Sequence, residues 1–337
     1  MSIIAKIKKA NLVGRGGAGF PTALKWESVY KAKGETKFVV INAAEGEPGV
    51  KKDGYILANH TTEMFAGVRL AMDYLGAEKC YLYINEAYYK RDRLGILKAV
   101  KANSLTKRFE FFVKPHEAGY IGGEETSILN AISGFKIEPR LKPPYPTTSG
   151  LWEMPTLIDN VETFYNVSLV EKGEYQKERF YTINGPVKNP GVYSFPNDWT
   201  IEEVLYKSGN YPKFPFFVQV GGDACGEVLN ESQLGVSATG AASITIYDLE
   251  KHQPKKLLQY WINFFSNNSC GQCTPCREGT YRLAEMLQQK TVDWNIFTDL
   301  LDSLTETSFC ALGGSDSTPV KSYFKNVLNN NLKKIIL

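Results

Sequence analysis

The chain has 337 residues, of which 43% are hydrophobic and 22% are charged, as in an ordinary globular protein of two or three domains. Its 39 basic and 36 acidic side chains leave a net charge of only +3, and no Lys/Arg-rich block is present, so nucleic acid is not an expected partner. No apolar run is long enough to cross a bilayer, and residues 1–20 lack a signal-peptide core. These features predict a cytoplasmic protein with no direct membrane insertion.

The first 170 residues alternate between helical and strand patterns. Residues 1–13 are expected to be helical and lead into the glycine-rich segment GRGGAGFPT. Apolar stretches rich in β-branched or aromatic residues then alternate with amphipathic stretches. The strands are expected at 37–44, 79–85 and 108–115, and the helices at 23–33, 61–76 and 89–103. This alternation predicts an α/β domain with a mostly parallel sheet over residues 1–170.

The pattern changes after residue 170. Residues 171–250 contain short strands, a Pro-Gly turn and one helical stretch, which predicts a compact α+β domain. Residues 251–337 are almost entirely helical in pattern, and the last expected helix, at 319–337, has a polar break. The sequence therefore predicts three domains with boundaries near residues 170 and 250.

Three of the six cysteines follow the spacing C-x2-C-x2-C in the segment SCGQCTPCREGT. These are Cys270, Cys273 and Cys276, and Cys310 lies downstream in FCALGG. Such closely spaced thiolates, with a fourth from elsewhere in the fold, are typical ligands of an Fe4S4 cluster. Zinc is the competing metal, although its sites usually combine two separate Cys or His pairs. Plain core packing is the remaining alternative.

The other two cysteines, Cys80 and Cys225, are each isolated among apolar or small residues. They are expected to be inert core cysteines.

The segment GRGGAGF formally matches the dinucleotide fingerprint G-x-G-x-x-G, but a helix rather than a strand is expected before it, so a Rossmann interpretation is weak. Its four glycines still allow the backbone to approach an anion closely, and a helix begins behind them. Lys25, one turn into that helix, could complete a phosphate contact. A flexible turn is the alternative.

Two acidic segments follow expected strands. NAAEGEPG contains Glu45 and Glu47, and YIGGEET contains Glu124 and Glu125. Ligands bind beyond the carboxyl ends of parallel strands, so these carboxylates are expected at one mouth, where they suit hydroxyls, an amide or a metal ion better than phosphate. They could also be solvated strand-end charges, or, for Glu125, a helix N-terminal charge.

Taken in order, GRGGAGFPTALKW, NAAEGEPG, GYIGGEET, PTLIDNVET, SCGQCTPCREGT and FCALGG resemble the FMN- and NADH-binding flavoprotein subunit of respiratory complex I. The same pattern occurs in the β subunits of NAD-linked [FeFe] hydrogenases and formate dehydrogenases. The resemblance covers nearly the whole chain. It implies a Rossmann-like FMN-binding α/β domain, a ubiquitin-like or SLBB-type α+β domain, and a C-terminal helical bundle with one Fe4S4 cluster.

The resemblance also implies roles for individual residues. The FMN phosphate and ribityl chain would be held by Gly14, Arg15, Gly16, Gly17, Ala18, Gly19 and Lys25. The flavin would be lined by Asn42, Tyr120, Gly123, Asp159 and Asn160. Phe20 would stack on the adenine of NADH, and Glu45, Glu47, Glu124 and Glu125 would face the bound nucleotide. The cluster ligands would be Cys270, Cys273, Cys276 and Cys310.

The implied function is exchange of hydride between NAD(P)H and FMN, followed by single-electron transfer through the cluster to a partner, without an acid–base catalytic residue. Expected partners are iron–sulfur subunits: a thioredoxin-like [2Fe-2S] subunit and a hydrogenase, formate dehydrogenase or similar redox subunit. Ala44 and Ser28 depart from the family pattern, which has Asp and an aromatic residue there. These departures favour the alternative of a relay or docking subunit that uses no nucleotide.

Overall fold

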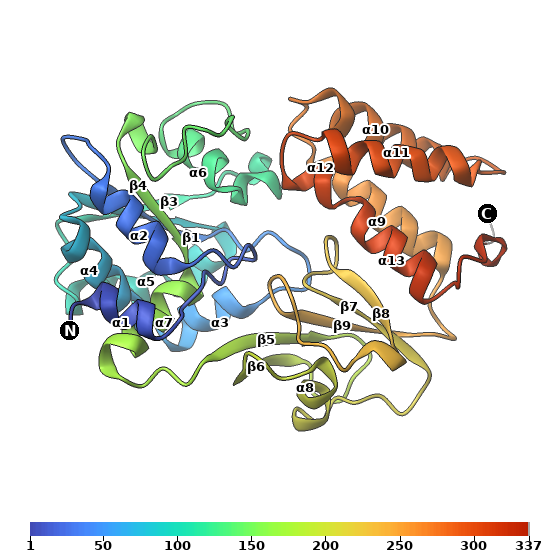
Figure 1. Cartoon of the computed structure of the whole chain (residues 1–337), viewed down its shortest axis with the longest axis horizontal. Coiled ribbons are helices and arrows are strands. Elements are labelled where there is room, and N and C mark those ends of the chain that lie inside the picture. Colours follow the sequence, from blue (N-terminus) through green and yellow to red (C-terminus); the bar gives the residue numbers. More distant parts are fainter. Residues whose placement is uncertain (336–337) are drawn as a thin grey trace. The chain divides into compact units, whose positions relative to one another are not determined.

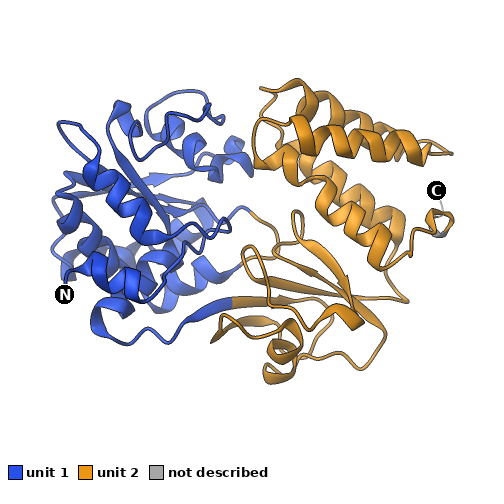
Figure 2. Cartoon of the chain, viewed as in Figure 1, with its two compact units in different colours: residues 1–46, 51–180 blue, residues 47–50, 181–337 orange. Residues whose placement is uncertain are grey.

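The computed structural model describes residues 1–335, and the chain divides into two compact units, coloured separately in Figure 2. The first unit contains residues 1–46 and 51–180. The second contains residues 47–50 together with those from 181 onward. The predicted α+β and helical domains therefore lie within one unit, and the first unit extends past residue 170.

The first unit, which runs from blue to green in Figure 1, is built on a four-stranded parallel sheet with the order β3-β2-β1-β4. The strands are β1 (Phe38–Ala43), β2 (Lys79–Ile84), β3 (Phe109–Val113) and β4 (Thr156–Asn160). The sequence predicted the first three and the parallel arrangement, but not β4. The register of β4 on β1 pairs Asn42 with Asn160, so two side-chain amides meet at the carboxyl edge of the sheet.

Helices flank this sheet. They are α1 (Ile3–Lys9), α2 (Thr22–Lys31), α3 (Lys52–Asn59), α4 (Thr61–Leu75), α5 (Glu86–Ala102), α6 (Glu125–Ile132) and α7 (Val161–Lys172), with short 3-10 turns η1 (His116–Ala118), η2 (Ile121–Gly123) and η3 (Leu151–Glu153). The helices expected at 23–33, 61–76 and 89–103 are confirmed, and α4 ends at Gly76 with φ +62°, as a glycine C-cap should. The expected helix at 1–13 is shorter, and α3 and α7 were not predicted.

Successive side chains of a strand point to opposite faces of the sheet, and in β1 the side chains on both faces are covered by helices. Val40 of β1 packs with Ile128 and Leu129 of α6 on one face. Val39 and Ile41 point to the opposite face, where α4 and α7 contact β1, and all three strand side chains are fully buried. A sheet buried on both faces requires the nearly continuous apolar strands that the sequence contains.

The second unit contains a mixed five-stranded sheet with the order β6-β5-β9-β7-β8. Its strands are β5 (Glu178–Asn184), which begins in the first unit, β6 (Gly191–Pro196), β7 (Phe216–Val220), β8 (Glu227–Asn230) and β9 (Ser243–Asp248). Helix α8 (Ile201–Lys207) begins with a capping box between Thr200 and Glu203, and η4 (Glu231–Gln233) follows β8. This arrangement confirms the predicted α+β part.

The C-terminal part of the second unit is helical, as predicted. It contains α9 (Pro254–Asn268), α10 (Thr274–Met286), α11 (Trp294–Thr307), α12 (Ala311–Ser315), α13 (Ser317–Asn326) and the turn η5 (Leu332–Lys334). The helix expected at 319–337 ends at Asn326, and residues 336–337 lie outside the described part of the chain. Over residues 1–335, every helix is too short or too polar to span a bilayer.

Candidate functional site

The glycine-rich loop forms a closed turn between α1 and α2. Val13 bridges Pro21, and the N–H of Gly14 donates to the carbonyl oxygen of Phe20 at 2.8 Å. Gly17 and Gly19 have φ values of +118° and +64°, a region that glycine adopts without strain. Residues 15–18 form a turn, and within the described part of the chain no side chain of the N-cap residue Pro21 caps the start of α2.

The loop is fixed to α7 and lies against the end of β4. The N–H of Arg15 donates to Thr163 Oγ1 at 2.9 Å, and its guanidinium, which is buried, donates to the hydroxyl of Tyr175 at 3.1 Å. A Cβ added to Gly16 would lie 3.4 Å from Cβ of Asn160, so the loop backbone approaches that side chain closely. Arg15 thus anchors the loop through its own side chain, and the loop backbone lies against Asn160, where the sequence predicts an anion site.

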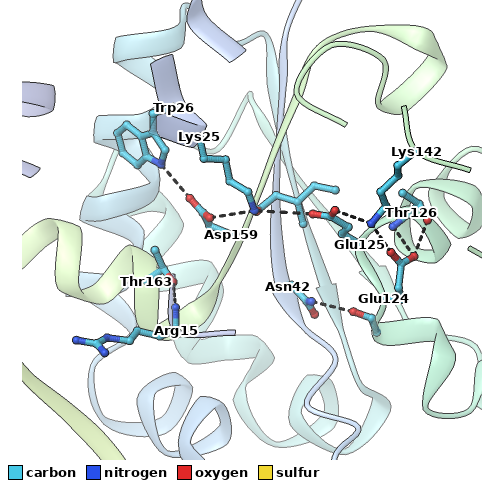
Figure 3. Close-up of polar contacts among 12 residues, drawn as sticks. Arg15, Lys25, Trp26, Asn42, Glu124, Glu125, Thr126, Lys142, Asp159 and Thr163 are labelled. Atoms are coloured by element: carbon cyan, nitrogen blue, oxygen red, sulfur yellow. Dashed lines mark hydrogen bonds and ion pairs between the residues drawn. The ribbon is translucent and has the colours of Figure 1, made fainter. Parts of the chain in front are cut away.

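Lys25 reaches from α2 to the same strand end (Figure 3). Its Nζ donates to the carbonyl oxygen of Ile158 at 2.6 Å and lies 3.6 Å from Asp159 and 3.8 Å from Glu125. Asp159 also accepts from Trp26 Nε1 at 2.9 Å. Burial raises the pKa of Asp159, and Lys25 and Trp26 oppose that shift.

The other residues expected around the flavin meet at the carboxyl ends of β1 and β4. Asn42 Nδ2 donates to the carbonyl oxygen of Gly123 at 3.1 Å, and its Oδ1 accepts from the N–H of Ala44. A Cβ on Gly123 would lie 3.3 Å from Cβ of Ala44, and Tyr120 precedes η2 in the same loop. The structure therefore brings Asn42, Gly123 and Asn160 to one edge, as the sequence predicted for strand ends.

Glu124 and Glu125, at the start of α6, make different contacts. Glu124 is the N-cap, and its carboxylate accepts from the N–H groups of Thr126 and Ser127 at 2.8 and 2.9 Å. Lys142 Nζ lies 3.0 Å from Glu124 and 2.9 Å from Glu125 (Figure 3). Lys142 was missed by the sequence reasoning. Lys142 lies in the LKPPYP segment, which has no strand or helix pattern that could place it near the site. Its positive charge was the only sequence feature that could have indicated a role there.

Glu45 and Glu47, expected beside Glu124 and Glu125, are held by other parts of the chain. Glu45, at φ +35°, accepts from the N–H groups of Asp53 and Gly54 at 2.7 and 3.0 Å and from the Tyr88 hydroxyl. Glu47 belongs to the second unit, where it accepts from the N–H groups of residues 224 and 225 at 2.9 and 3.0 Å. By contrast, the Phe20 ring is 52% exposed, as a stacking platform requires.

The four cysteines of the predicted cluster lie around the start of α10 and the start of α12. Cys270 follows the end of α9, Cys273 is the residue before α10, Cys276 lies in its first turn, and Cys310 directly precedes α12. Cys276 is 4% exposed, and a Cβ on Gly313 of α12 would lie 3.1 Å from Cys276 Cβ. The two chain segments are therefore in direct contact at this point.

The four thiols are also close enough to influence one another. Burial raises the pKa of Cys276 to about 11, with further increases from Cys273, Cys310 and Cys270. Burial likewise raises the pKa of Cys310, opposed by the backbone N–H groups of Leu312 and Gly313. Buried thiols that repel one another when ionised are suited to a cationic iron centre, which would stabilise the thiolates.

The arrangement also bears on the choice between a cluster and zinc. Within residues 1–335, no three His, Cys, Asp or Glu side chains are placed to bind a single metal ion. Zinc draws its thiolates to about 2.3 Å from one centre, whereas a cubane binds each thiolate at a different iron and accepts wider spacing. The four cysteines, with three of them in C-x2-C-x2-C spacing, are a donor set that fits an Fe4S4 cluster.

Of the two cysteines outside this group, Cys80 is fully buried in β2, as predicted. Cys225 is only partly buried, in the turn before β8, so the predicted core position is wrong for it. The apolar signal was weak there, because Cys225 lies between Ala224 and Gly226 rather than in a strand.

Comparison with known protein families matches both regions. Residues 7–169 match the model of the Nuo51 FMN-binding domain, and residues 256–330 match the NADH-ubiquinone oxidoreductase-F iron–sulfur binding region. In this structure, the glycine loop is the feature that fits FMN, and the four neighbouring thiols are the feature that fits the iron–sulfur cluster. The chain is thus a flavin- and iron–sulfur-binding protein of the oxidoreductase class.

Full-length relatives define the family. The chain is 32% identical to the F 2 subunit of NADH-quinone oxidoreductase from Rhizobium meliloti (strain 1021), over 96% of this chain and 86% of the relative. It is 33% identical to the corresponding F subunit from Aquifex aeolicus (strain VF5), over 92% of this chain and 80% of the relative. The chain belongs to the family of the F subunits of NADH-quinone oxidoreductase.

The fold also matches a solved structure, that of an NAD+-reducing [NiFe]-hydrogenase in the air-oxidized state. The TM-score is 0.90 and the sequence identity is 28% over 99% of this chain. This chain spans 62% of the length of the matched hydrogenase chain. The α/β, α+β and helical parts predicted from the sequence therefore occur together in a known oxidoreductase.

Replacing Gly19 by valine is expected to weaken FMN binding about tenfold to a hundredfold. At φ +64° a β-branched side chain costs about 1–3 kcal/mol, and relief of that strain would turn the loop N–H groups away from the phosphate. FMN affinity is measured by quenching of flavin fluorescence. Gly76→Val is the matched control, since Gly76 has nearly the same φ, +62°, at the end of α4. Equal loss of FMN in both variants would contradict a phosphate-binding role for the loop.

Proposed function

We propose that this chain exchanges hydride between NAD(P)H and bound FMN and passes electrons one at a time through a single Fe4S4 cluster to a partner redox protein. The observation that carries the proposal is the meeting of the glycine loop, Asn42 and Asn160 at the carboxyl edge of the first sheet. The chain contains one group of four cysteines, so the electrons must leave to another protein.

The residues divide the task. The N–H groups of residues 16–19 and the start of α2 hold the FMN phosphate, while Asn42 and Asn160 orient the ring. Bound FMN supplies the chemistry that links two-electron hydride transfer to one-electron carriers. Cys270, Cys273, Cys276 and Cys310 hold the cluster through one thiolate each.

The nucleotide is held by exposed and partly exposed groups of the first unit. Phe20 offers its ring for stacking on adenine, and Glu125 with Lys142 offers a carboxylate and an ammonium for ribose hydroxyls and phosphate. Glu124 contributes less to the nucleotide, because its carboxylate already caps α6.

The partners proposed for this chain are iron–sulfur subunits: a thioredoxin-like [2Fe-2S] subunit and a hydrogenase, formate dehydrogenase or similar redox subunit. Their chemistry follows from the cluster, which exchanges single electrons with a neighbouring cluster. Co-purification of the chain from its own cells under anaerobic conditions, followed by mass spectrometry, tests this assignment.

A relay protein that uses no nucleotide is the second candidate. One observation favours it: the carboxylates of Glu45 and Glu47 are already bound by backbone N–H groups of the chain. Together with Ala44 and Ser28, this leaves fewer polar and aromatic groups for a nucleotide than the family pattern has.

Nucleotide titration separates the two candidates. We expect NADH or NADPH, added without oxygen, to bleach the absorbance of the bound flavin. Glu125→Gln is expected to raise the nucleotide concentration for half-reduction about tenfold, because one charged hydrogen bond is lost. Glu86→Gln is the matched control, since Glu86 opens α5 and pairs with Lys90 as Glu125 opens α6 and pairs with Lys142. Absence of bleaching by either nucleotide would establish the relay function instead.

A further inference from the structure

A buried group of charged side chains lies behind Asn160, at the start of α3. Lys52 is 2% exposed, and its Nζ lies 2.8 Å from Asp53 Oδ1, 3.1 Å from Glu162 Oε2 and 3.3 Å from Asn160 Oδ1. Glu45 binds the backbone N–H groups of Asp53 and Gly54 from the other side. We call Lys52, Asp53, Glu162 and Glu45 the Lys52 ion group.

The Lys52 ion group has more acids than bases. Three carboxyl groups surround one ammonium group, and both Asp53 and Glu162 are buried. The other groups that face it are the Tyr88 hydroxyl, which donates to Glu45, and the neutral amide of Asn160. Arg91 lies beyond Tyr88 and donates to the carbonyl oxygen of Gly54. One ammonium does not balance three carboxylates, and the burial of Asp53 and Glu162 makes their charges costly, so the group favours retention of a proton on one carboxyl.

Asp53 is the carboxyl of this group that touches both Lys52 and Asn160, at 2.8 and 2.6 Å, and burial acts strongly on its charge. Burial raises its pKa to about 7, and the repulsion from Glu45 and Glu162 adds to the increase, while Lys52 opposes it. Burial and the neighbouring carboxylates thus make the charge of the group depend on pH.

Asn160 connects the Lys52 ion group to the edge of the sheet. Its Oδ1 accepts from the N–H of Glu162 at 2.9 Å and from Lys52, which fixes the orientation of the amide. One of its two Nδ2 hydrogens is donated to Asp53 Oδ2 at 2.6 Å. The second Nδ2 hydrogen remains for a ligand at the carboxyl edge, where Gly16 lies against Asn160.

We infer that Asp53 is a positioning residue for the bound flavin: it fixes the amide of Asn160, and the protonation state of its carboxyl sets the flavin's reduction potential. This inference rests on one part of the proposed function, the binding of FMN beside Asn160. It does not require that the protein bind NAD(P)H. Neutral Asp53 loses its proton to solvent as the pH rises, and the ion group becomes more negative by one charge. A negative charge near the ring opposes the addition of electrons, so the potential falls more steeply with pH than it would without Asp53.

The test compares the flavin potential of wild-type protein and Asp53→Asn between pH 6 and pH 8. The holoprotein is reduced with dithionite and redox mediators, and the flavin band is followed. Asparagine resembles the neutral acid at every pH, so the two potentials should agree at pH 6, and the variant should be more positive at pH 8. Asp73→Asn, an exposed aspartate on α4, is the matched control and should follow the wild type throughout.

Three results would separate the inference from the proposed function. Parallel pH profiles for wild type and Asp53→Asn would overturn the inference. Failure of NAD(P)H to bleach the flavin would overturn the proposed function, because dithionite does not depend on a nucleotide site. Purified protein that binds no FMN would overturn both.

If Asp53→Asn does not fold, the inference about Asp53 can be tested by a measurement on the wild-type protein. The infrared difference spectrum between the reduced and oxidised protein should contain a carbonyl band of a protonated carboxyl group that shifts in D2O. This band should be present at pH 6 and weaken by pH 8. A spectrum without such a band at pH 6 would overturn the inference.

Discussion

Replacing Cys276 by serine is expected to abolish the iron–sulfur cluster while leaving FMN bound. Cys276 is buried at the first turn of α10 and lies against α12, so its sulfur is held in place by the packing of both helices. A serine hydroxyl is a much weaker ligand for iron than a thiolate. The residues proposed to bind the flavin lie in the first unit, and the four cysteines lie in the second. The measurement is iron content together with the electron paramagnetic resonance signal of the reduced protein, and flavin is quantified separately.

Cys225→Ser is the matched control for this experiment. Cys225 is a partly buried cysteine of the same unit, and its backbone N–H, which the substitution retains, donates to Glu47 at 3.0 Å. The control should keep the full iron content. A Cys276→Ser protein with four irons and an unchanged resonance signal would contradict the assignment of the ligands.

Replacing Lys52 by methionine is expected to lower the free energy of unfolding of the first unit by about 3–5 kcal/mol. The substitution leaves Asp53 and Glu162 buried without their shared ammonium group, and breaking a buried pair costs more than the pair contributes. The pKa of Lys52 is raised, because the attraction of Asp53 and Glu162 outweighs its burial, so the lysine is charged at neutral pH. Urea unfolding followed by circular dichroism measures the change.

Two further variants show whether charge is the cause. Lys90→Met removes an exposed lysine from an i,i+4 pair with Glu86 and should change stability little. The double variant Lys52→Met/Glu162→Gln should recover part of the loss, because it removes the uncompensated charge of buried Glu162. If the double variant is no more stable than Lys52→Met alone, lost packing rather than lost charge explains the effect.

Three features of the site could be predicted from local sequence patterns. The C-x2-C-x2-C spacing predicted the cluster ligands, because three of the proposed ligands come from one short segment. The four glycines of the loop indicated an anion site, because the required backbone conformations are a local property. The apolar stretches and amphipathic stretches of residues 37–115 predicted the first three strands of the parallel sheet and the helices α4 and α5.

Other residues became part of the site only through contacts distant in sequence. Lys142 meets Glu124 and Glu125 across a segment without regular structure, and its partners could not be read from its neighbours. Asp53 and Asn160 are separated by 107 residues but share a hydrogen bond. The short strand β4 also escaped prediction, although its register on β1 is what places Asn160 beside Asn42.

The two acidic segments show most clearly which properties of the site the sequence determines and which depend on the tertiary structure. The sequence determined that carboxylates follow the strand ends, and it predicted one common mouth for them. The tertiary structure decided that Glu45 caps α3, that Glu47 belongs to the second unit, and that Glu124 and Glu125 share Lys142. A carboxylate binds whichever N–H or ammonium groups the fold brings within about 3 Å, and that choice depends on distant parts of the chain rather than on local pattern.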